Sequence, residues 1–310
     1  MTRLFTPPEG STRHLVDIET ILPAAMAQRA EEGGVKRAAM DPLNVFVLSL
    51  LAGAFIAFGA TFATTVSSAS IAMPGGAAPL PFGLVRLLTG VVFSVGLLMV
   101  VIAGAELFTG NNMIVMAWAS GKVTTGALLR NWGISYAGNC IGAIAAAGLV
   151  FISQQYTSGG GAVGLSALAT ANAKANLDFA PALALGILCN ALVCLAVWMC
   201  HAARTTIDRV VTIVPPVAAF VACGFEHSIA NVYFLPMGLF IKQGAPDSFW
   251  NSVNSSPANF AGLTWDRFLF GNLLPVTIGN IIGGSLMVAA VYWFVYLRGN
   301  RSVARAHDNA

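Results

Sequence analysis

The stretches "AGAELFTGNNMIV" (103–115) and "ACGFEHSIANVYF" (222–234) both place glycines and polar residues inside a long apolar run. Both carry the pattern Gly-x-Glu-x4-Asn, at a constant offset of 120 residues. The residues of the pattern are Gly104, Glu106 and Asn111 in the first stretch and Gly224, Glu226 and Asn231 in the second. A second echo links "GNCIG" (138–142) with "GNIIG" (279–283). The two echoes indicate an internal duplication.

The composition excludes a water-soluble globule. Of the 310 residues, 56% are apolar and only 9% are charged, and the mean hydropathy is +0.74. Soluble domains carry about a quarter charged residues, so the chain is predicted to be an integral membrane protein. The net charge of +3 is small and no basic cluster alternates with aromatic residues, so nucleic acid is not an expected partner. The amino-terminal segment has no apolar run of signal-peptide length, so no cleaved signal is expected.

Six apolar ranges are long enough to cross a bilayer, which takes about 20 residues. They are 43–66, 85–118, 127–152, 180–201, 210–241 and 270–297. The second and fifth overshoot a core of about 30 Å at 1.5 Å per residue, and they contain the two quoted stretches. The sequence therefore predicts an all-α fold of two three-span repeats of opposite orientation, in which the second and fifth helices are broken. Paired broken helices of this kind place a transport site near the middle of the membrane.

The distribution of Lys and Arg predicts that both termini are cytoplasmic. Twelve lie in the amino-terminal segment, the carboxyl tail and the connections on their side, and four lie in the alternate connections. We expect a cytoplasmic segment at 1–42, a six-helix channel domain at 43–298 and a cytoplasmic tail at 299–310. Within the first segment, 15–34 has the spacing of an amphipathic helix, which suits either packing or regulation.

Away from the ends of the predicted spans, the Asp, Glu, Lys, Arg and His residues are three, Glu106, Glu226 and His227. Each is costly, at about 2.5–3.5 kcal/mol on insertion scales. Because the glutamates repeat, we expect them to hold the shape of the breaks by bonding freed backbone groups. His227 has no counterpart, since Leu107 stands at the equivalent position, so we expect it to line a pore. An imidazole can donate a hydrogen bond to an anion or exchange a proton with it, and Thr109 supplies a hydroxyl at the other break.

Other chemistry finds less support. A Cys223–His227 nucleophile lacks a visible orienting residue or oxyanion device, so an intramembrane hydrolase is a distant alternative. The cysteines fall in or at the ends of apolar segments, and one mid-span histidine does not make a metal site. We expect no metal and no cofactor. From periodicity alone, Phe93, Leu97, Leu107 and Phe220 suit either hydrophobic constrictions or ordinary core packing.

Three stretches in order, "AGAELFTGNNMIV", "GFEHSIANVYFLPMG" and "PVTIGNIIGG", together resemble the formate/nitrite transporter family and are closest to its formate channels. The resemblance runs from about residue 21 to residue 298, and residues 1–15 fall outside it. It implies an aquaporin-like fold of six spans per subunit, a homopentamer with one pore per subunit, and a bacterial inner-membrane location.

The resemblance also implies roles for individual residues. The pore positions are the central histidine His227, its facing threonine Thr109, the constriction leucines Leu97 and Leu107, the cytoplasmic-slit aromatic Phe93, the periplasmic-slit aromatic Phe220, the vestibule lysine Lys174, and Asn280. Polar support of the pore falls to Glu106, Glu226 and Asn231, with Asn280 beside the histidine loop. The family's amino-terminal helix has been associated with gating, which bears on 15–34.

The expected function is a passive or proton-coupled formate channel, with protons and membrane lipid as further partners. Two departures from the family touch the second-helix break: Glu106 stands where formate members often have Asp, and "GNN" replaces a Ser/Thr pair. A nitrite or hydrosulfide channel of the same family therefore stays open as an alternative. An aquaporin-like pore for neutral solutes is a further alternative, and it would not need Lys174.

Overall fold

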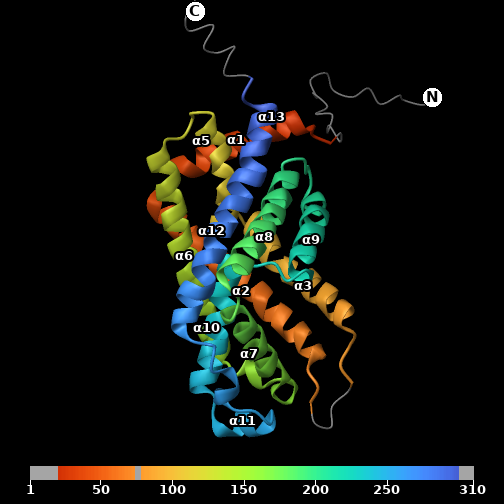
Figure 1. Ribbon diagram of the computed structural model, residues 1–310. Helices are drawn as coiled ribbons and strands as arrows, with labels where there is room; N and C mark the ends of the chain where they lie inside the picture. Colours follow the sequence, from red (N-terminus) through yellow and green to blue (C-terminus); the bar gives the residue numbers. More distant parts are fainter. Residues whose placement is uncertain (1–19, 74–77, 300–310) are drawn as a thin grey trace, which may run out of the picture.

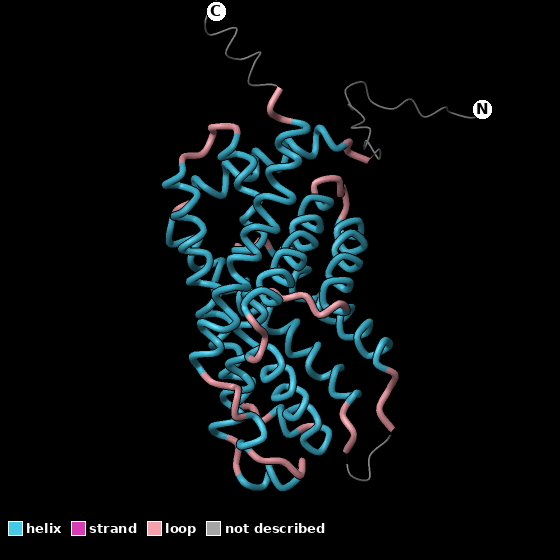
Figure 2. The backbone as a smooth tube through the Cα atoms, viewed as in Figure 1, coloured by secondary structure: helices cyan, strands magenta, loops and turns pink. Residues whose placement is uncertain are grey.

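The computed structural model describes residues 20–73 and 78–299, and every regular element among them is a helix (Figure 2). Residues 1–19, 74–77 and 300–310 lie outside the described part. The expectations for residues 1–15 and for nearly all of the 299–310 tail therefore concern residues that the structure does not describe. The prediction of an all-helical chain is confirmed for the rest.

Five helices are long and apolar enough to cross a membrane. They are Pro42–Ser70 (α2, Pro42–Ser67, with the 3-10 turn η1, Ser68–Ser70), α3 (Phe82–Ala103), α6 (Thr125–Ile152), α8 (Phe179–Cys200) and Arg267–Tyr296. The last is built from η6 (Arg267–Leu273), α12 (Leu274–Ile281), η7 (Ile282–Ala290) and α13 (Val291–Tyr296). The range 210–241, predicted as the fifth span, is instead divided between α9 (Thr206–Ala222) and α10 (Ser228–Gly244).

Side chains at the helix starts set where the spans begin. Asp41 accepts hydrogen bonds from the backbone N–H groups of Leu43 and Asn44 at 3.0 and 3.1 Å, and Pro42 occupies the first turn. This pairing suits a helix start, because the amide groups of the first turn have no partner inside the helix. At α9, Thr205 and Asp208 form a reciprocal capping box.

The two quoted stretches break their helices in the same way. α3 ends at Ala103 and α9 ends at Ala222. A glycine in the left-handed region follows, Gly104 (φ 80°) directly after α3 and Gly224 (φ 76°) one residue further on after α9. Such a conformation strains any residue with a Cβ, which explains the glycines. The chain then runs extended for a few residues before α4 (Phe108–Asn111) and α10 begin.

Beyond the first break the chain continues as short helical pieces, and beyond the second it continues as one helix. After α4 come the 3-10 turn η2 (Asn112–Ile114) and α5 (Val115–Ala119). The remaining short elements are η3 (Gln155–Thr157), η4 (Gly159–Gly161), α11 (Asp247–Ser252) and η5 (Pro257–Phe260).

Small residues allow the spans to approach closely. α2 packs against α3 and α6, and α8 packs against α12. A Cβ added at Gly142 would overlap the carbonyl oxygen of Leu50, and one at Gly283 would overlap that of Ile187. These glycines belong to the echoed "GNCIG" and "GNIIG" stretches, so the echo marks two equivalent helix contacts.

Two helices outside the spans matter for the site. α1 (Pro23–Ala39) lies across the end of the molecule that also carries α13, and it packs on η2 and α5 (Figure 1). α7 (Ala162–Ala175) lies in the opposite half and packs on α10. The predicted bounds of 15–34 for the amphipathic helix are wrong at the carboxyl end, because α1 runs on to Ala39. Its first turn contains Pro23, whose fixed φ suits a helix start, and residues 15–19 lie outside the described part.

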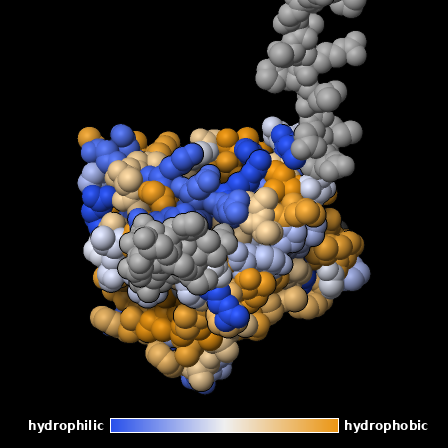
Figure 3. All heavy atoms as spheres, turned by 90° about the horizontal axis from the view of Figure 1, so that it is seen from above, coloured by the Kyte–Doolittle hydropathy of each residue, from blue (hydrophilic) through white to orange (hydrophobic). Residues whose placement is uncertain are grey.

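The outer surface divides by polarity. Seen from the α1 end, hydrophilic residues gather on the end face and hydrophobic residues surround it (Figure 3). Large apolar side chains are exposed along the outer sides of the spans, for example Phe58 on α2, Leu149 on α6 and Phe270 in η6. Such faces suit lipid or a neighbouring subunit, because contiguous apolar surface is otherwise rare on soluble proteins.

Candidate functional site

The first break is held by a buried network around Glu106. Its Oε2 accepts a hydrogen bond of 2.7 Å from Asn111 Nδ2, and its Oε1 lies 3.4 Å from Arg37 Nε of α1. Asn111 Nδ2 also lies 2.9 Å from Asn131 Oδ1 on α6, and Asn131 Nδ2 donates to the carbonyl of Arg37 at 3.2 Å. The carboxylate is therefore both hydrogen-bonded and charge-paired, as a buried charge requires.

The second break has the same arrangement around Glu226. Its Oε2 accepts a hydrogen bond of 2.6 Å from Asn231 Nδ2, and its Oε1 lies 2.6 Å from Lys174 Nζ of α7. Asn231 Nδ2 lies 2.7 Å from Asn272 Oδ1, and Asn272 Nδ2 donates to the carbonyl of Lys174 at 3.0 Å. Each of these four contacts of the first network thus has a counterpart in the second.

One buried asparagine fixes the backbone at each break. Asn139 Nδ2 donates to the carbonyls of Ser49 and Glu106 at 2.8 and 2.9 Å, and its Oδ1 accepts from the Phe108 N–H at 2.8 Å. Asn280 Nδ2 donates to the carbonyls of Gly186 and Glu226 at 2.8 and 2.9 Å, and its Oδ1 accepts from the Ser228 N–H at 2.9 Å. The expectation that Asn280 lines the pore is wrong, because its whole amide is committed to backbone and the side chain is fully buried.

His227 and Thr109 meet where the two breaks face each other. The imidazole Nε2 lies 3.0 Å from Thr109 Oγ1, and both side chains are buried. The imidazole Nδ1 accepts a hydrogen bond of 3.1 Å from the backbone N–H of Ala230. Because an accepting nitrogen carries no proton, a neutral ring in this position carries its proton on Nε2 and donates it to Thr109 Oγ1.

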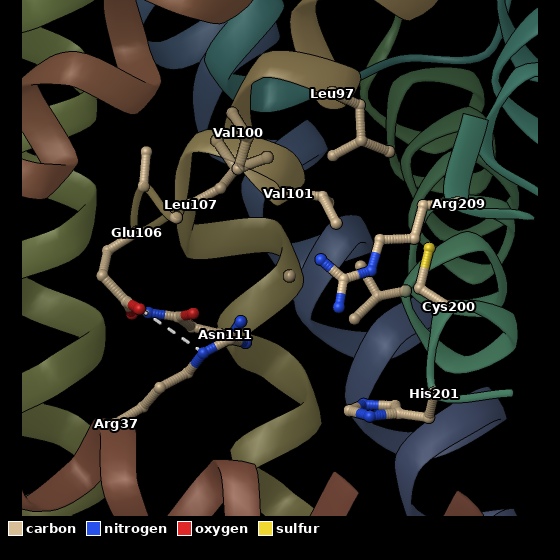
Figure 4. A pocket seen from close by; sticks show the side chains of 14 residues that line it. Arg37, Leu97, Val100, Val101, Glu106, Leu107, Asn111, Cys200, His201 and Arg209 are labelled. Carbon is tan, nitrogen blue, oxygen red and sulfur yellow. Dashed lines mark hydrogen bonds and ion pairs between the residues drawn. The ribbon is translucent and has the colours of Figure 1, made fainter. Parts of the chain in front are cut away.

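Two cavities approach this pair from opposite ends. The α1 cavity, of about 290 Å³, is lined by Leu97, Leu107, Glu106, Asn111, Arg37, His201 and Arg209 among others (Figure 4). The α7 cavity, of about 90 Å³, is lined by Phe93, Phe220, Phe234, His227, Lys174 and Arg86 among others. The α7 cavity thus reaches His227 itself, with Phe93 and Phe220 in its wall. Neither Thr109 nor His227 lines the α1 cavity, whose wall contains Leu97 and Leu107.

The expectation that Phe93 and Phe220 stand at opposite slits is wrong. Their ring centroids lie 5.8 Å apart in an edge-to-face contact, and both line the α7 cavity. Phe93 lies about one helical turn before Leu97 on α3, so it is farther from the break at Gly104 and from the α1 cavity. Phe220 lies near the end of α9, which packs against α3. The two rings therefore form one aromatic constriction on the α7 side of His227.

Lys174 lines the α7 cavity, as expected of a vestibule lysine, but its charge is not free. It forms the 2.6 Å ion pair with Glu226, and its side chain is only 16% exposed. Its Nζ also lies 5.5 Å from the ring centroid of Phe234. Lys174 therefore stabilises the second break directly, and any attraction for anions is reduced by its carboxylate partner.

Several site residues were not expected from the sequence. Asn131, Asn139 and Asn272 complete the networks, and Arg37 supplies the cation of the first one. The repeated "GN" marks Asn139 beside Asn280, but no pattern in the sequence distinguishes Arg37 from the other charges of the amino-terminal segment. Arg86, His201 and Arg209 also line the cavities. Arg86 donates to the carbonyls of Ala222 and Val221 at 2.9 and 2.8 Å, so it caps the carboxyl end of α9.

A nucleophilic pair is not assembled. Both ring nitrogens of His227 are bonded elsewhere, to Thr109 and to Ala230, and Cys223 is exposed. Among residues 20–73 and 78–299, no group of three or more His, Cys, Asp and Glu side chains could hold a metal ion. The chemistry of the site is therefore that of hydrogen-bond donors, fixed charges and apolar constrictions.

Known proteins resemble this chain over most of its length. The sequence profile described as formate/nitrite transporter matches residues 24–294. The chain is 46% identical over 282 residues to the formate channel FocA of Escherichia coli strain K12, which covers 91% of this chain and 96% of that protein. It is 38% identical over 268 residues to the formate channel FocA of Haemophilus influenzae, with coverage of 86% and 92%.

A solved structure described as a pentameric formate channel with formate bound is similar at a TM-score of 0.77 and 42% identity, covering 83% of this chain and 98% of that one. These likenesses and the five apolar helices identify a multi-pass membrane protein. They also confirm the resemblance seen in the sequence: the chain belongs to the formate/nitrite transporter family.

Proposed function

We propose that this protein is a channel for formate in a bacterial inner membrane, with one pore in each subunit of a homopentamer. Relatives that match most of the chain are named formate channels, and the similar solved structure is a pentamer with formate bound. The exposed apolar faces of the spans offer surface for both lipid and neighbouring subunits.

The proposed topology has six spans in an aquaporin-like arrangement of two inverted three-helix repeats. α9 and α10 together form the fifth span, and the matched networks of Glu106 and Glu226 support the repeat. The described chain begins at α1 and ends after α13 at the same end of the molecule (Figure 1), which the Lys and Arg distribution assigns to the cytoplasm. The proposed division is an amino-terminal segment (1–42), a channel domain (43–298) and a tail (299–310).

The observation that carries the proposal is the 3.0 Å contact between Thr109 and His227. It brings one polar pair from the two breaks together between two apolar constrictions, Leu97–Leu107 and Phe93–Phe220. An anion that crosses these constrictions loses its hydration, which is costly unless its charge is neutralised or hydrogen-bonded.

His227 reduces this cost in one of two protonation states. The neutral ring donates the Nε2 hydrogen bond to a formate oxygen in place of Thr109. The imidazolium instead transfers its Nε2 proton to a formate oxygen, which gives formic acid and a neutral imidazole. Formic acid crosses the apolar constriction without a charge and returns the proton to water beyond it.

Protonation of His227 is coupled to the position of the ring. An imidazolium carries a proton on Nδ1 as well, and this proton would face the Ala230 N–H that now donates to Nδ1. The ring must give up that bond to hold the second proton. Passage of formate is therefore expected to depend on pH.

The test is formate flux into liposomes between pH 4 and 8 for the wild type, His227→Asn and His227→Phe. Asn keeps a hydrogen-bond donor but cannot be protonated, so we expect His227→Asn to conduct with a flat pH profile. We expect His227→Phe, which can do neither, to abolish flux. A His227→Asn profile that matches the wild type would remove the proton-exchange role, and a wild type without formate flux would remove the channel assignment.

A nitrite or hydrosulfide channel is the second candidate, favoured by the family description and by Glu106 at the first break. Competition of both anions against formate in the same liposomes ranks the three substrates. Urea flux through the wild type tests the remaining alternative of a neutral-solute pore, for which formate would be excluded and urea would pass.

A further inference from the structure

The α1 cavity contains a guanidinium that no other group of the described chain engages. Arg209 lies in the first turns of α9, and its side chain points into the cavity between Val101 and His201 (Figure 4). Within residues 20–73 and 78–299, this guanidinium donates no hydrogen bond and forms no ion pair. The imidazole of His201, at the end of α8, also faces this space without a hydrogen bond to a described residue.

The cations of the α7 cavity are committed. Lys174 is paired with Glu226 at 2.6 Å, and Arg86 donates two hydrogen bonds to the carbonyls at the end of α9. A cation that already has a partner attracts a second anion less strongly. The two cavities therefore differ in whether a described cation is unpaired, and an unpaired cation favours the capture of an anion.

The charges around Arg209 do not neutralise it. Glu106 lines the same cavity, but its carboxylate is already bonded to Arg37 and Asn111 (Figure 4). Arg29 and Arg37 of α1 add positive charge near His201. A cavity with this balance has a positive potential, which concentrates small anions.

His201 is neutral under ordinary conditions. Burial, together with the positive charges of Arg37, Arg29 and Arg209, lowers the pKa of its imidazole from 6.5 to about 4. A neutral imidazole has one N–H to donate, so it can complete the coordination of an anion held by a guanidinium.

We propose that the α1 cavity is a binding site for a small monocarboxylate, held by the guanidinium of Arg209 and by an N–H of His201. A planar guanidinium matches a carboxylate through two parallel hydrogen bonds, which makes this pair the natural one for formate. A cavity of about 290 Å³ holds such an anion together with part of its water. The naming of formate rests on the proposed function, whereas the site itself rests on the geometry.

The site lies before the Leu97–Leu107 constriction, so it serves loading from the α1 side. We expect Arg209→Gln to raise the half-saturating formate concentration about fivefold when formate is supplied at that side, which corresponds to about 1 kcal/mol at a partly exposed charge. When formate is supplied at the α7 side, the half-saturating concentration should not change. We expect the half-saturating formate concentration of Arg209→Lys to lie between those of the wild type and Arg209→Gln, because Lys keeps the charge but lacks the planar fork.

Flux is measured against formate concentration in right-side-out and inside-out membrane vesicles carrying the full chain. Lys36→Gln is the matched control, because it removes one positive charge from exposed α1 without touching the cavity. An Arg209→Gln shift confined to one vesicle orientation, with none in Lys36→Gln, supports the site. Equal values for Arg209→Gln and the wild type, or the same shift in both orientations, would overturn it.

A second measurement separates the site from the proposed function. Phenylglyoxal modifies accessible arginines, and mass spectrometry follows its rate at Arg209 in the detergent-solubilised protein with and without formate. We expect formate to slow modification several-fold at Arg209 and not at Arg204, which does not line the cavity. Protection of Arg209 in a protein that conducts no formate would contradict the proposed channel function and support the site. Formate conduction without protection of Arg209 would contradict the site and leave the channel function standing.

Discussion

Glu106 and Glu226 occupy the same place in two matching sets of contacts at the two helix breaks. Each carboxylate accepts a hydrogen bond from the asparagine five residues later and pairs with a cation on a helix outside the spans. These cations, Arg37 and Lys174, come from α1 and α7, which directly precede α2 and α8. α1 and α7 therefore hold equivalent places in the two networks, and each pairs its cation with the glutamate of one break.

The two ion pairs differ in burial, and this predicts unequal effects on stability. The side chain of Lys174 is 16% exposed and that of Arg37 is 37% exposed. Glu226→Gln leaves a poorly solvated ammonium without its partner, so we expect a loss of about 3 kcal/mol of unfolding free energy. Glu106→Gln leaves a guanidinium that water can reach, and we expect a smaller loss of about 1 kcal/mol. Thermal unfolding in detergent measures both.

Two controls accompany this comparison. Glu31→Gln breaks the pair with Lys122, whose side chain is 54% exposed, so it should be nearly neutral. Lys174→Met combined with Glu226→Gln removes both charges and should recover part of the lost stability. Equal destabilisation by Glu106→Gln and Glu226→Gln would show that desolvation of the cation is not what distinguishes the two networks.

Gly142 is expected to be intolerant of any side chain. A Cβ there would overlap the carbonyl of Leu50, which belongs to the backbone of α2 and cannot rotate away. We expect Gly142→Ala to cost about 3 kcal/mol of stability or to prevent assembly of α6 on α2. Gly148→Ala lies on the same helix with nothing within 4 Å of the added Cβ, so it should be neutral or slightly stabilising. Similar melting temperatures for the two variants would contradict the close helix contact.

The breaks and the central histidine follow from the sequence because their signals are local. A glycine and a glutamate inside an apolar run indicate a helix break without any knowledge of distant residues. The constant offset of 120 residues between the two patterns pairs Glu106 with Glu226. Asymmetry within the repeat, Leu107 against His227, marked the position that lies beside Thr109 in the structure. The glycines and the repeated pattern are therefore sufficient to predict the two breaks and the position of the central histidine.

The partners of the breaks do not follow from the sequence, because they depend on three-dimensional packing. Arg37 and Asn131 reach Glu106 and Asn111 from other helices, and neither has a distinctive pattern in the sequence. The side of the pore on which Phe93 lies could have been predicted, because the Lys and Arg distribution starts the second span on the side opposite the amino terminus and Phe93 precedes the break.

Thr109 is expected to set the orientation of the central imidazole. Thr109→Val keeps the shape but removes the hydroxyl that lies 3.0 Å from His227 Nε2. We expect formate flux in liposomes to fall about tenfold, equivalent to about 1.4 kcal/mol on the barrier, because a polar step of the path becomes apolar. Thr109→Ser restores the hydroxyl and should restore most of the flux. If Val and Ser conduct equally, the hydroxyl has no part in permeation.

His201 makes the stability of the protein sensitive to acid in a defined window. Burial, together with Arg37, Arg29 and Arg209, lowers the pKa of its imidazole from 6.5 to about 4 in the folded protein. Between these values the unfolded chain binds a proton that the folded chain does not, so stability rises with pH and is lost as the pH falls from 6.5 towards 4. The loss reaches at most about 3 kcal/mol per subunit, since one pKa unit is about 1.4 kcal/mol. His201→Gln removes this proton, so its thermal unfolding midpoint should fall less steeply than that of the wild type between pH 6.5 and 4.5 and should track it above pH 7. Parallel curves for the two proteins over the whole range would mean that the folded protein protonates His201 as readily as the unfolded chain does.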